Sequence, residues 1–119
     1  MRKLIYLIIC LGILTLSSTA FADEKSYNES WCSDHNGQTE VINDDRTRVD
    51  CLTSEYAIEV DYASKWYEAV GQSLHYGLKT EKKPGILLII KNEKDMKYYD
   101  RLMNTIKNYS LPITVWTVR

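Results

Sequence analysis

The chain has 119 residues, of which 45% are hydrophobic and 26% charged, and its net charge is −1. This length fits one domain with a modest core. The balance of charges excludes a protein that binds nucleic acid through a broad basic surface, and the sequence has no internal repeat, low-complexity tract or interdomain linker.

Residues 1–22 have the pattern of a signal peptide. Arg2 and Lys3 precede a mostly apolar run at 4–16, and small residues follow it, ending in Ala20-Phe21-Ala22. The run is shorter than the roughly 20 residues of a membrane span, although a retained signal anchor is the alternative. We expect export to the periplasm or the cell exterior, a single domain at 23–119, and no stable membrane association after cleavage.

Removal of Arg2 and Lys3 would leave 13 basic and 16 acidic side chains, a net charge of −3. Two cysteines, Cys32 and Cys51, would remain. An even cysteine count in a small exported domain favours a disulfide. Metal ligation and a reactive thiol are the alternatives, but the chain has no C-x-x-C motif and no histidine at ligand-like spacing.

The remaining pattern predicts alternating helices and strands. We expect a short helix at 28–36 after a frayed polar start, and an antiparallel meander of three short strands. A helix with 3.6-residue periodicity, a strand buried on both faces, a second amphipathic helix and a last strand follow. We expect strands at 38–42, 47–53, 56–62, 86–91 and 113–118. The two later helices are expected at 63–79 and 93–109, and a turn at 82–85. This order predicts an α/β fold with a mixed sheet.

Acidic residues gather on two neighbouring predicted strands. Glu59 and Asp61 alternate with apolar residues and therefore share one face of their strand, and a tight hairpin would bring Asp50 of the preceding strand close to Glu59. Crowded carboxylates repel one another, which raises a pKa or recruits a hard cation such as Mg²⁺. Lys65, Gln72 and Tyr76 fall together on one face of the following helix. These residues predict a pocket for a divalent metal and a phosphate.

This pattern resembles the PD-(D/E)XK nuclease superfamily, and in particular its RecB-like branch, whose helix carries Q-x-x-x-Y. Asp50 and Glu59 match the acidic motif positions, and Gln72 and Tyr76 match the helix motif. The resemblance covers about residues 29–92. It implies a restriction-endonuclease-like αβββαβ core with an additional C-terminal helix and strand, and an exported nuclease that hydrolyses DNA or RNA.

The resemblance also implies roles for individual residues. Asp50 and Glu59, with Asp61 as a third ligand, would bind Mg²⁺ or Mn²⁺. Gln72 and Tyr76 would position the metal, the water or the substrate backbone. Asp61 departs from the family pattern because it stands where the motif lysine is expected, and Lys65 would replace that lysine from the helix. Glu29 is a weak match to an additional acid on the first helix.

Each of these residues also has a purely structural explanation. Asp50 and Glu59 could be solvated acids on an exposed sheet face, Asp61 could cap the following helix, and Tyr76 could pack through its ring. The alternative function is therefore a binding module of the periplasm that keeps the nuclease fold without catalysis. A thiol oxidoreductase is disfavoured because C-x-x-C is absent.

Overall fold

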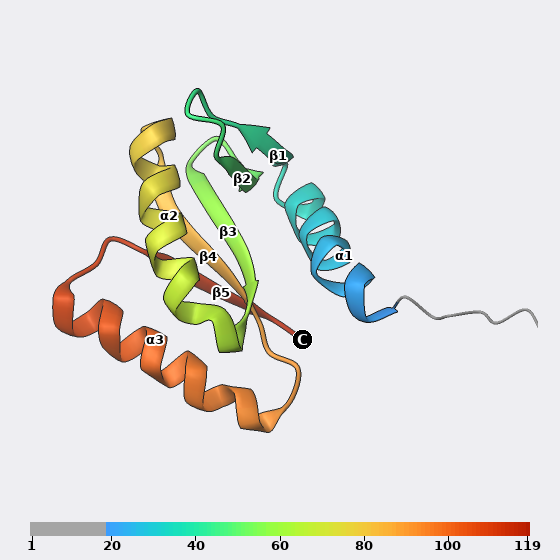
Figure 1. Ribbon diagram of the computed structural model, residues 1–119, viewed down its shortest axis with the longest axis vertical. Helices are drawn as coiled ribbons and strands as arrows, with labels where there is room; N and C mark the ends of the chain where they lie inside the picture. The colour runs from blue at the N-terminus through green and yellow to red at the C-terminus, as the bar shows by residue number, and fades with distance from the viewer. Residues whose placement is uncertain (1–18) are drawn as a thin grey trace, which may run out of the picture.

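A five-stranded mixed sheet forms the centre of the computed structural model, which describes residues 19–119, with side chains from Glu24 onward. The strands lie in chain order from one edge to the other (Figure 1). β1 to β3 form an antiparallel meander, and β3, β4 and β5 run parallel. The strands are β1 (Gln38–Ile42), β2 (Arg48–Leu52), β3 (Tyr56–Tyr62), β4 (Lys83–Ile89) and β5 (Thr114–Val118). The predicted mixed α/β architecture is confirmed.

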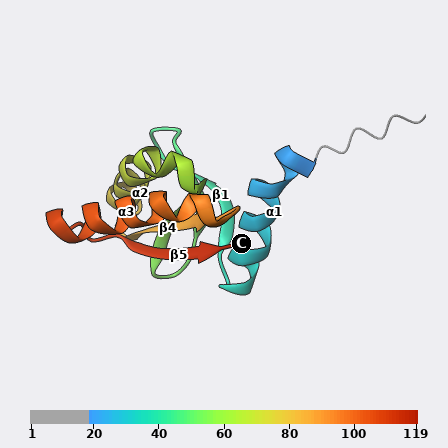
Figure 2. The same ribbon diagram turned by 90° about the horizontal axis from the view of Figure 1, so that it is seen from below.

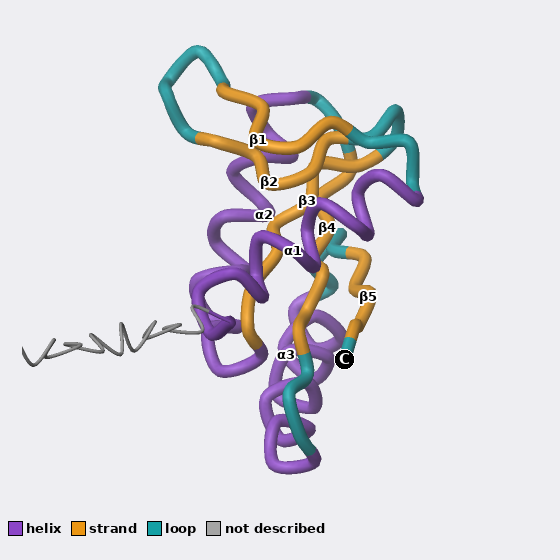
Figure 3. The backbone as a smooth tube through the Cα atoms, turned by 90° about the vertical axis from the view of Figure 1, so that its right-hand side faces the viewer, coloured by secondary structure: helices purple, strands orange, loops and turns teal. Residues whose placement is uncertain are grey.

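Three α-helices cover the sheet. The parallel strands are joined by α2 (Trp66–Thr80), which follows a short 3-10 turn at Ala63–Lys65, and by α3 (Met96–Tyr109), which follows another at Glu93–Asp95. Both lie on one face of the sheet (Figure 2). α1 (Thr19–Asp34) packs against β1, β2 and β3 from the other face (Figure 3).

The apolar run in β4 explains this three-layer arrangement. Ile86, Leu88 and Ile90 pack with residues of α2 and α3, whereas Leu87 and Ile89 pack beneath α1. All five side chains are buried. Because successive strand residues point to opposite faces, a strand with apolar residues at every position requires cover on both. The predicted strand buried on both faces is confirmed.

Several predicted boundaries differ from the structure by one or two residues, such as the end of β4 at Ile89 rather than at residue 91, and two differ by more. The first helix begins at Thr19 rather than at residue 28, since Tyr27, Trp31 and Cys32 follow helical spacing and pack on the sheet. β4 begins at Lys83, within the predicted turn at 82–85, because the Lys83 amide bonds to the Glu55 carbonyl and the pairing with β3 starts there. The chain reverses two residues before Lys83, at Glu81, which ends α2 in a left-handed conformation with φ 57°.

The predicted signal peptide lies mostly outside the described residues, which begin at Thr19. Its predicted cleavage point, after Ala22, falls within α1. Among residues 19–119, none of the helices has the length and apolar character that crossing a membrane requires.

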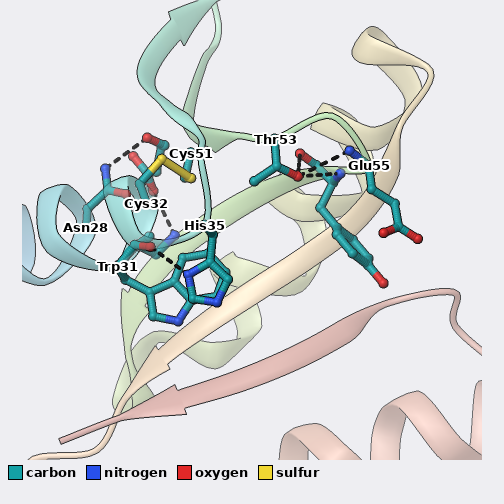
Figure 4. Close-up of a disulfide and its surroundings, with 10 residues drawn as sticks. Asn28, Trp31, Cys32, His35, Cys51, Thr53 and Glu55 are labelled. Carbon is teal, nitrogen blue, oxygen red and sulfur yellow. Dashed lines mark hydrogen bonds between the residues drawn. A yellow bond between two sulfur atoms is a disulfide. The ribbon is translucent and has the colours of Figure 1, made fainter.

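The predicted disulfide is confirmed: Cys32 of α1 is bonded to Cys51 of β2, with 5.8 Å between their Cα atoms (Figure 4). Both cysteines are fully buried. Gly37 passes directly over the bridge, since a Cβ at this position would lie 2.5 Å from the Cys32 sulfur and 2.6 Å from that of Cys51. The bridge therefore fixes the C-terminal half of α1 to the meander.

Replacing both cysteines by alanine is expected to lower the free energy of unfolding by about 3 kcal/mol, because the bridge closes a short loop in the unfolded chain. Urea denaturation followed by circular dichroism measures this loss. A conservative Val49→Ala variant, which removes buried apolar volume from the same strand, serves as a control for packing loss. Equal unfolding midpoints for the oxidised wild type and the double variant would contradict the prediction.

Candidate functional site

Asp50 and Glu59 meet where β2 separates from β3. The backbone pairing between these strands covers Cys51 with Ile58 and Leu52 with Ala57. Asp50 comes directly before Cys51 on β2. One of its carboxylate oxygens accepts a hydrogen bond from the Val60 amide of β3 at 2.8 Å, so a side chain takes the place of a backbone acceptor between the strands. The Asp50 and Glu59 carboxyl groups are hydrogen-bonded to each other. The predicted proximity of these two acids is confirmed.

Burial and neighbouring acids make Glu59 a strongly perturbed carboxyl group. Only 6% of this residue is exposed. Burial, followed by the nearby Asp50, raises the pKa of Glu59 to about 10. Burial also raises the pKa of Asp50, although the Val60 amide opposes the shift. Without a cation, the pair therefore retains a proton at neutral pH.

Asp61 is a third acidic residue, two positions after Glu59 on β3. It is 5% exposed, and burial, followed by the charge of Glu24, raises the pKa of Asp61 to about 7. One Asp61 oxygen accepts a hydrogen bond from the adjacent Tyr62 amide at 3.1 Å. The residue that caps the following 3-10 turn is Tyr62, and no side chain caps it, so the interpretation of Asp61 as a helix cap was wrong.

Lys65 lies near two of these carboxyl groups. Its positive charge lowers the pKa of Asp61 and of Glu24, against the larger effect of burial in both. The lysine side chain itself remains exposed. It therefore supplies positive potential at the rim of the acidic cluster rather than a buried counterion.

The two residues of the predicted helix motif differ in position. Tyr76 is 7% exposed and its hydroxyl donates a hydrogen bond to Glu59. Burial and the negative potential of Glu59 and Asp50 raise the pKa of Tyr76 to about 12. Gln72 lies one turn earlier on α2 and is exposed. The structure thus brings Tyr76 to the acidic pair and leaves Gln72 at the surface.

A pocket of about 220 Å³ opens beside Asp50, between α1 and the meander. Its lining residues come from four elements and include both charges: Glu24, Lys25, Asn28, Glu40, Arg48, Asp50 and Val60. Asn28 is 6% exposed and donates to the Asp50 carbonyl at 2.9 Å. Its side-chain oxygen is buried and has no hydrogen-bond partner within the described part of the chain. The acidic cluster is therefore accessible from the α1 side.

The donor set suits a hard cation with few protein ligands. Carboxylate oxygens are the ligands that Mg²⁺ prefers, and one or two of them, completed by water and phosphate, commonly suffice. Asp50 and Glu59 provide that pair, and the unpartnered Asn28 oxygen is an additional neutral donor on a residue that lines the same pocket as Asp50. Over residues 19–119, however, no group of three or more acidic, histidine or cysteine side chains is arranged to hold a metal. A two-carboxylate site fits, and a three-carboxylate site that includes Asp61 does not follow from this geometry.

Three residues at this site, Glu24, Asn28 and Arg48, were not predicted from the sequence. Glu24 occupies the position on the first helix that was predicted, weakly, for Glu29; Glu29 is exposed and pairs instead with Lys25 at 3.8 Å. Asn28 lies one helical turn after Glu24, and Arg48 lies two residues before Asp50 on the same strand. The helical spacing of Glu24 and Asn28 and the period-two spacing of Arg48 and Asp50 were the available signals.

Comparison with known proteins gives no relative: no family model, no curated protein and no solved structure matches this chain.

The free energy of unfolding of the metal-free protein is expected to fall as the pH rises from about 5 to about 9. The unfolded chain releases the Glu59 proton near its ordinary pKa of 4.5, whereas the folded protein holds it up to about pH 10. The folded state thus binds one proton more in this window, which corresponds to a slope of about −1.4 kcal/mol per pH unit. Asp61 adds a slope of the same sign below about pH 7.

Glu59→Gln removes the proton equilibrium of this residue and keeps its size, so the variant should lose most of the slope above pH 7. Urea denaturation in the presence of a chelator at several pH values measures it. Glu29→Gln, at an exposed position, is the matched control and should retain the wild-type slope. A wild-type stability independent of pH between 7 and 9 would contradict the raised pKa.

Proposed function

We propose that the protein is an exported, metal-dependent nuclease that hydrolyses phosphodiester bonds, with a PD-(D/E)XK-type site on a restriction-endonuclease-like core. The hydrogen-bonded pair of half-buried Asp50 and buried Glu59 carries the proposal. A protein without use for this pair would withdraw two acids from water at a considerable cost in desolvation, which the charge of Arg48 offsets only in part, at Asp50. Asp50 and Glu59 would together hold a divalent cation, which would offset that cost by taking the place of the shared proton.

The element order supports the proposed fold family. A helix, an antiparallel three-stranded meander, a helix and a parallel strand follow in sequence from α1 to β4, and α3 and β5 are the additional elements. The acids lie on the second and third strands, as in the family pattern. The Tyr76 hydroxyl, which contacts Glu59, is consistent with the positioning role that the Q-x-x-x-Y motif implies.

Asp50 and Glu59 are the proposed ligands, and the Asn28 oxygen beside them is available to a metal-bound water. When Mg²⁺ or Mn²⁺ is bound, it polarises the phosphoryl group and activates the attacking water. Tyr76 holds the Glu59 carboxyl group in orientation through its hydroxyl. Arg48, exposed at the mouth of the pocket, offers a guanidinium to a substrate phosphate.

Lys65 is the proposed replacement for the motif lysine. Its charge already acts on Asp61 and Glu24, and a flexible four-carbon side chain lets the ammonium approach the phosphate from the rim. With Asp61 ionised at pH values above its pKa of about 7, Asp61 would orient the water and Lys65 would stabilise the developing negative charge.

One observation favours a second candidate function, a binding module without catalysis. The position of the motif lysine is occupied by an acid, Asp61, and Lys65 is exposed rather than buried against the pair. Such a module would keep the cation and lose the hydrolytic step. Metal binding and cleavage therefore have to be measured separately.

The proposed location outside the cytoplasm is supported by the disulfide, because stable disulfides are typical of oxidising compartments. The signal-peptide pattern of residues 1–22 points to the same location.

Purified wild-type protein is expected to degrade single- or double-stranded DNA or RNA in Mg²⁺ or Mn²⁺ and not in a chelator. Glu59→Gln should lower the rate at least 100-fold, because one of two metal ligands is neutralised. Gel electrophoresis of labelled substrates measures cleavage. Glu29→Gln is the matched control and should cleave at the wild-type rate. If the wild type degrades none of the four substrates with either metal, the enzyme proposal fails.

Lys65→Met should lower the cleavage rate about 10- to 100-fold while leaving metal affinity nearly unchanged, since the lysine acts on the water or phosphate and is not a ligand. Thermal unfolding at increasing Mn²⁺ concentration measures affinity, because a ligand specific for the folded state raises the melting temperature. Lys107→Met, on α3, is the control for loss of a surface charge. A metal-induced stabilisation without any cleavage in the wild type would favour the binding module.

A further inference from the structure

A second pocket, of about 190 Å³, lies at the C-terminal end of α1. Aromatic side chains from α1, β3 and β5 line it, together with the tight turn between β2 and β3. Its residues are Trp31, His35, Thr53, Ser54, Glu55, Tyr56, Ile58 and Trp116. The proposed catalytic chemistry uses none of them.

Three aromatic side chains and one imidazole ring pack against one another around the pocket. Trp31 and His35 stack with their ring centroids 3.6 Å apart and their planes at 16°. Trp116 lies 5.2 Å from Trp31 and meets Tyr56 edge-to-face at 4.9 Å. Figure 4 shows the Trp31–His35 stack on one side of the sheet surface and the turn at Thr53 and Glu55 on the other. The pocket thus offers flat π surfaces to a planar ring.

Covalent and steric features hold these rings in place. Cys32, next to Trp31, is tied to β2 by the disulfide. The His35 ring nitrogen Nδ1 donates to the Trp31 carbonyl at 2.7 Å. Trp116 lies directly over Gly85 of β4, where a Cβ would come within 2.7 Å of its ring. Preorganised rings lose little conformational freedom when a ligand stacks on them.

Two lysines border the turn that forms one wall. The Lys82 ammonium donates to the Ser54 carbonyl at 2.9 Å, and the Lys83 ammonium pairs with Glu55 at 2.8 Å. Two positive charges against one negative leave this rim with an excess positive charge. A planar ring joined to a phosphate matches both the aromatic walls and this rim.

We infer that the aromatic pocket binds one nucleotide unit of a single-stranded nucleic acid, with the base against Trp31 and Trp116 and its phosphate toward Lys82 and Lys83. The choice of ligand rests on the proposed nuclease function. Base stacking on aromatic side chains beside a positively charged track is the general mode of single-strand recognition. A paired base cannot enter, because both of its faces are already stacked in the duplex.

The pocket also lies close to the place where α1 meets Asp50. Asn28, which donates to the Asp50 carbonyl at 2.9 Å, precedes Trp31 by three residues, about 4.5 Å along the helix axis. Binding here would hold a strand near the proposed site and compensate for the net negative charge expected of the mature domain.

The test measures binding of a fluorescein-labelled oligonucleotide of 12 deoxythymidines by fluorescence anisotropy. A chelator is present so that cleavage does not interfere. Wild type should bind it in preference to the same sequence in a duplex. Trp31→Ala should weaken binding about tenfold or more, since stacking contributes about 1–3 kcal/mol per base. Trp31→Phe keeps a ring, and thus the fold and most of the affinity. Lys82→Ala should lower the salt dependence of binding by about one counterion.

Tyr109→Ala is the matched control, because this exposed aromatic residue lies at the end of α3, outside the pocket. Its affinity should equal that of the wild type. Equal affinities for wild type and Trp31→Ala, or equal losses in Trp31→Ala and Tyr109→Ala, would overturn the inference. So would equal binding of duplex and single strand.

The two proposals can fail separately. Binding that depends on Trp31, in a protein that never cleaves, would sustain the pocket and reject the nuclease. Cleavage of single strands by Trp31→Ala with an unchanged KM would sustain the nuclease and reject the pocket.

Discussion

The contact between Asp50 and Glu59 is the constraint on which the site depends. It forms because β2 and β3 stop pairing through their backbones after Cys51 and Ile58, and the Asp50 side chain takes over as acceptor for the Val60 amide. That substitution turns a carboxylate inward, against a second acid that is itself buried. The stability of the metal-free protein then depends on a proton retained by the pair. A cation that replaced this proton would bind more tightly, because it would relieve the repulsion between the two carboxylates.

The first helix has a larger role than its sequence suggests. It contributes Glu24 and Asn28 to the acidic pocket and Trp31 to the aromatic pocket, and His35 follows directly after its last residue. The bond between Cys32 and Cys51 lies between these two groups and fixes the helix on the meander. One covalent link thus fixes the helix that lines both pockets relative to the sheet.

Local patterns predicted most of the fold. The alternation in residues 56–62, the apolar run of β4 and the helical periodicity of α2 and α3 each specify one element, because burial depends on which face a residue occupies. The predictions failed at the start of α1, where a stretch of polar residues is helical because the helix packs on the sheet. They also failed at Lys83, where pairing with β3 extends a strand into a segment that contains proline and glycine. Both errors arise from tertiary contacts that local propensity does not contain.

For the site, the sequence by itself determined that Asp50 and Glu59 would meet across a hairpin, that Tyr76 would share the helix face above them, and that Cys32 and Cys51 would pair. Strand alternation, helical spacing and cysteine count are enough for this. Only the tertiary structure decided that Glu24, and not Glu29, joins the acids, that Gln72 stays at the surface, and that four aromatic and imidazole rings from α1, β3 and β5 enclose a pocket. These outcomes depend on how α1 crosses the sheet, and the packing of elements distant in the chain, rather than any periodicity within one of them, fixes that crossing.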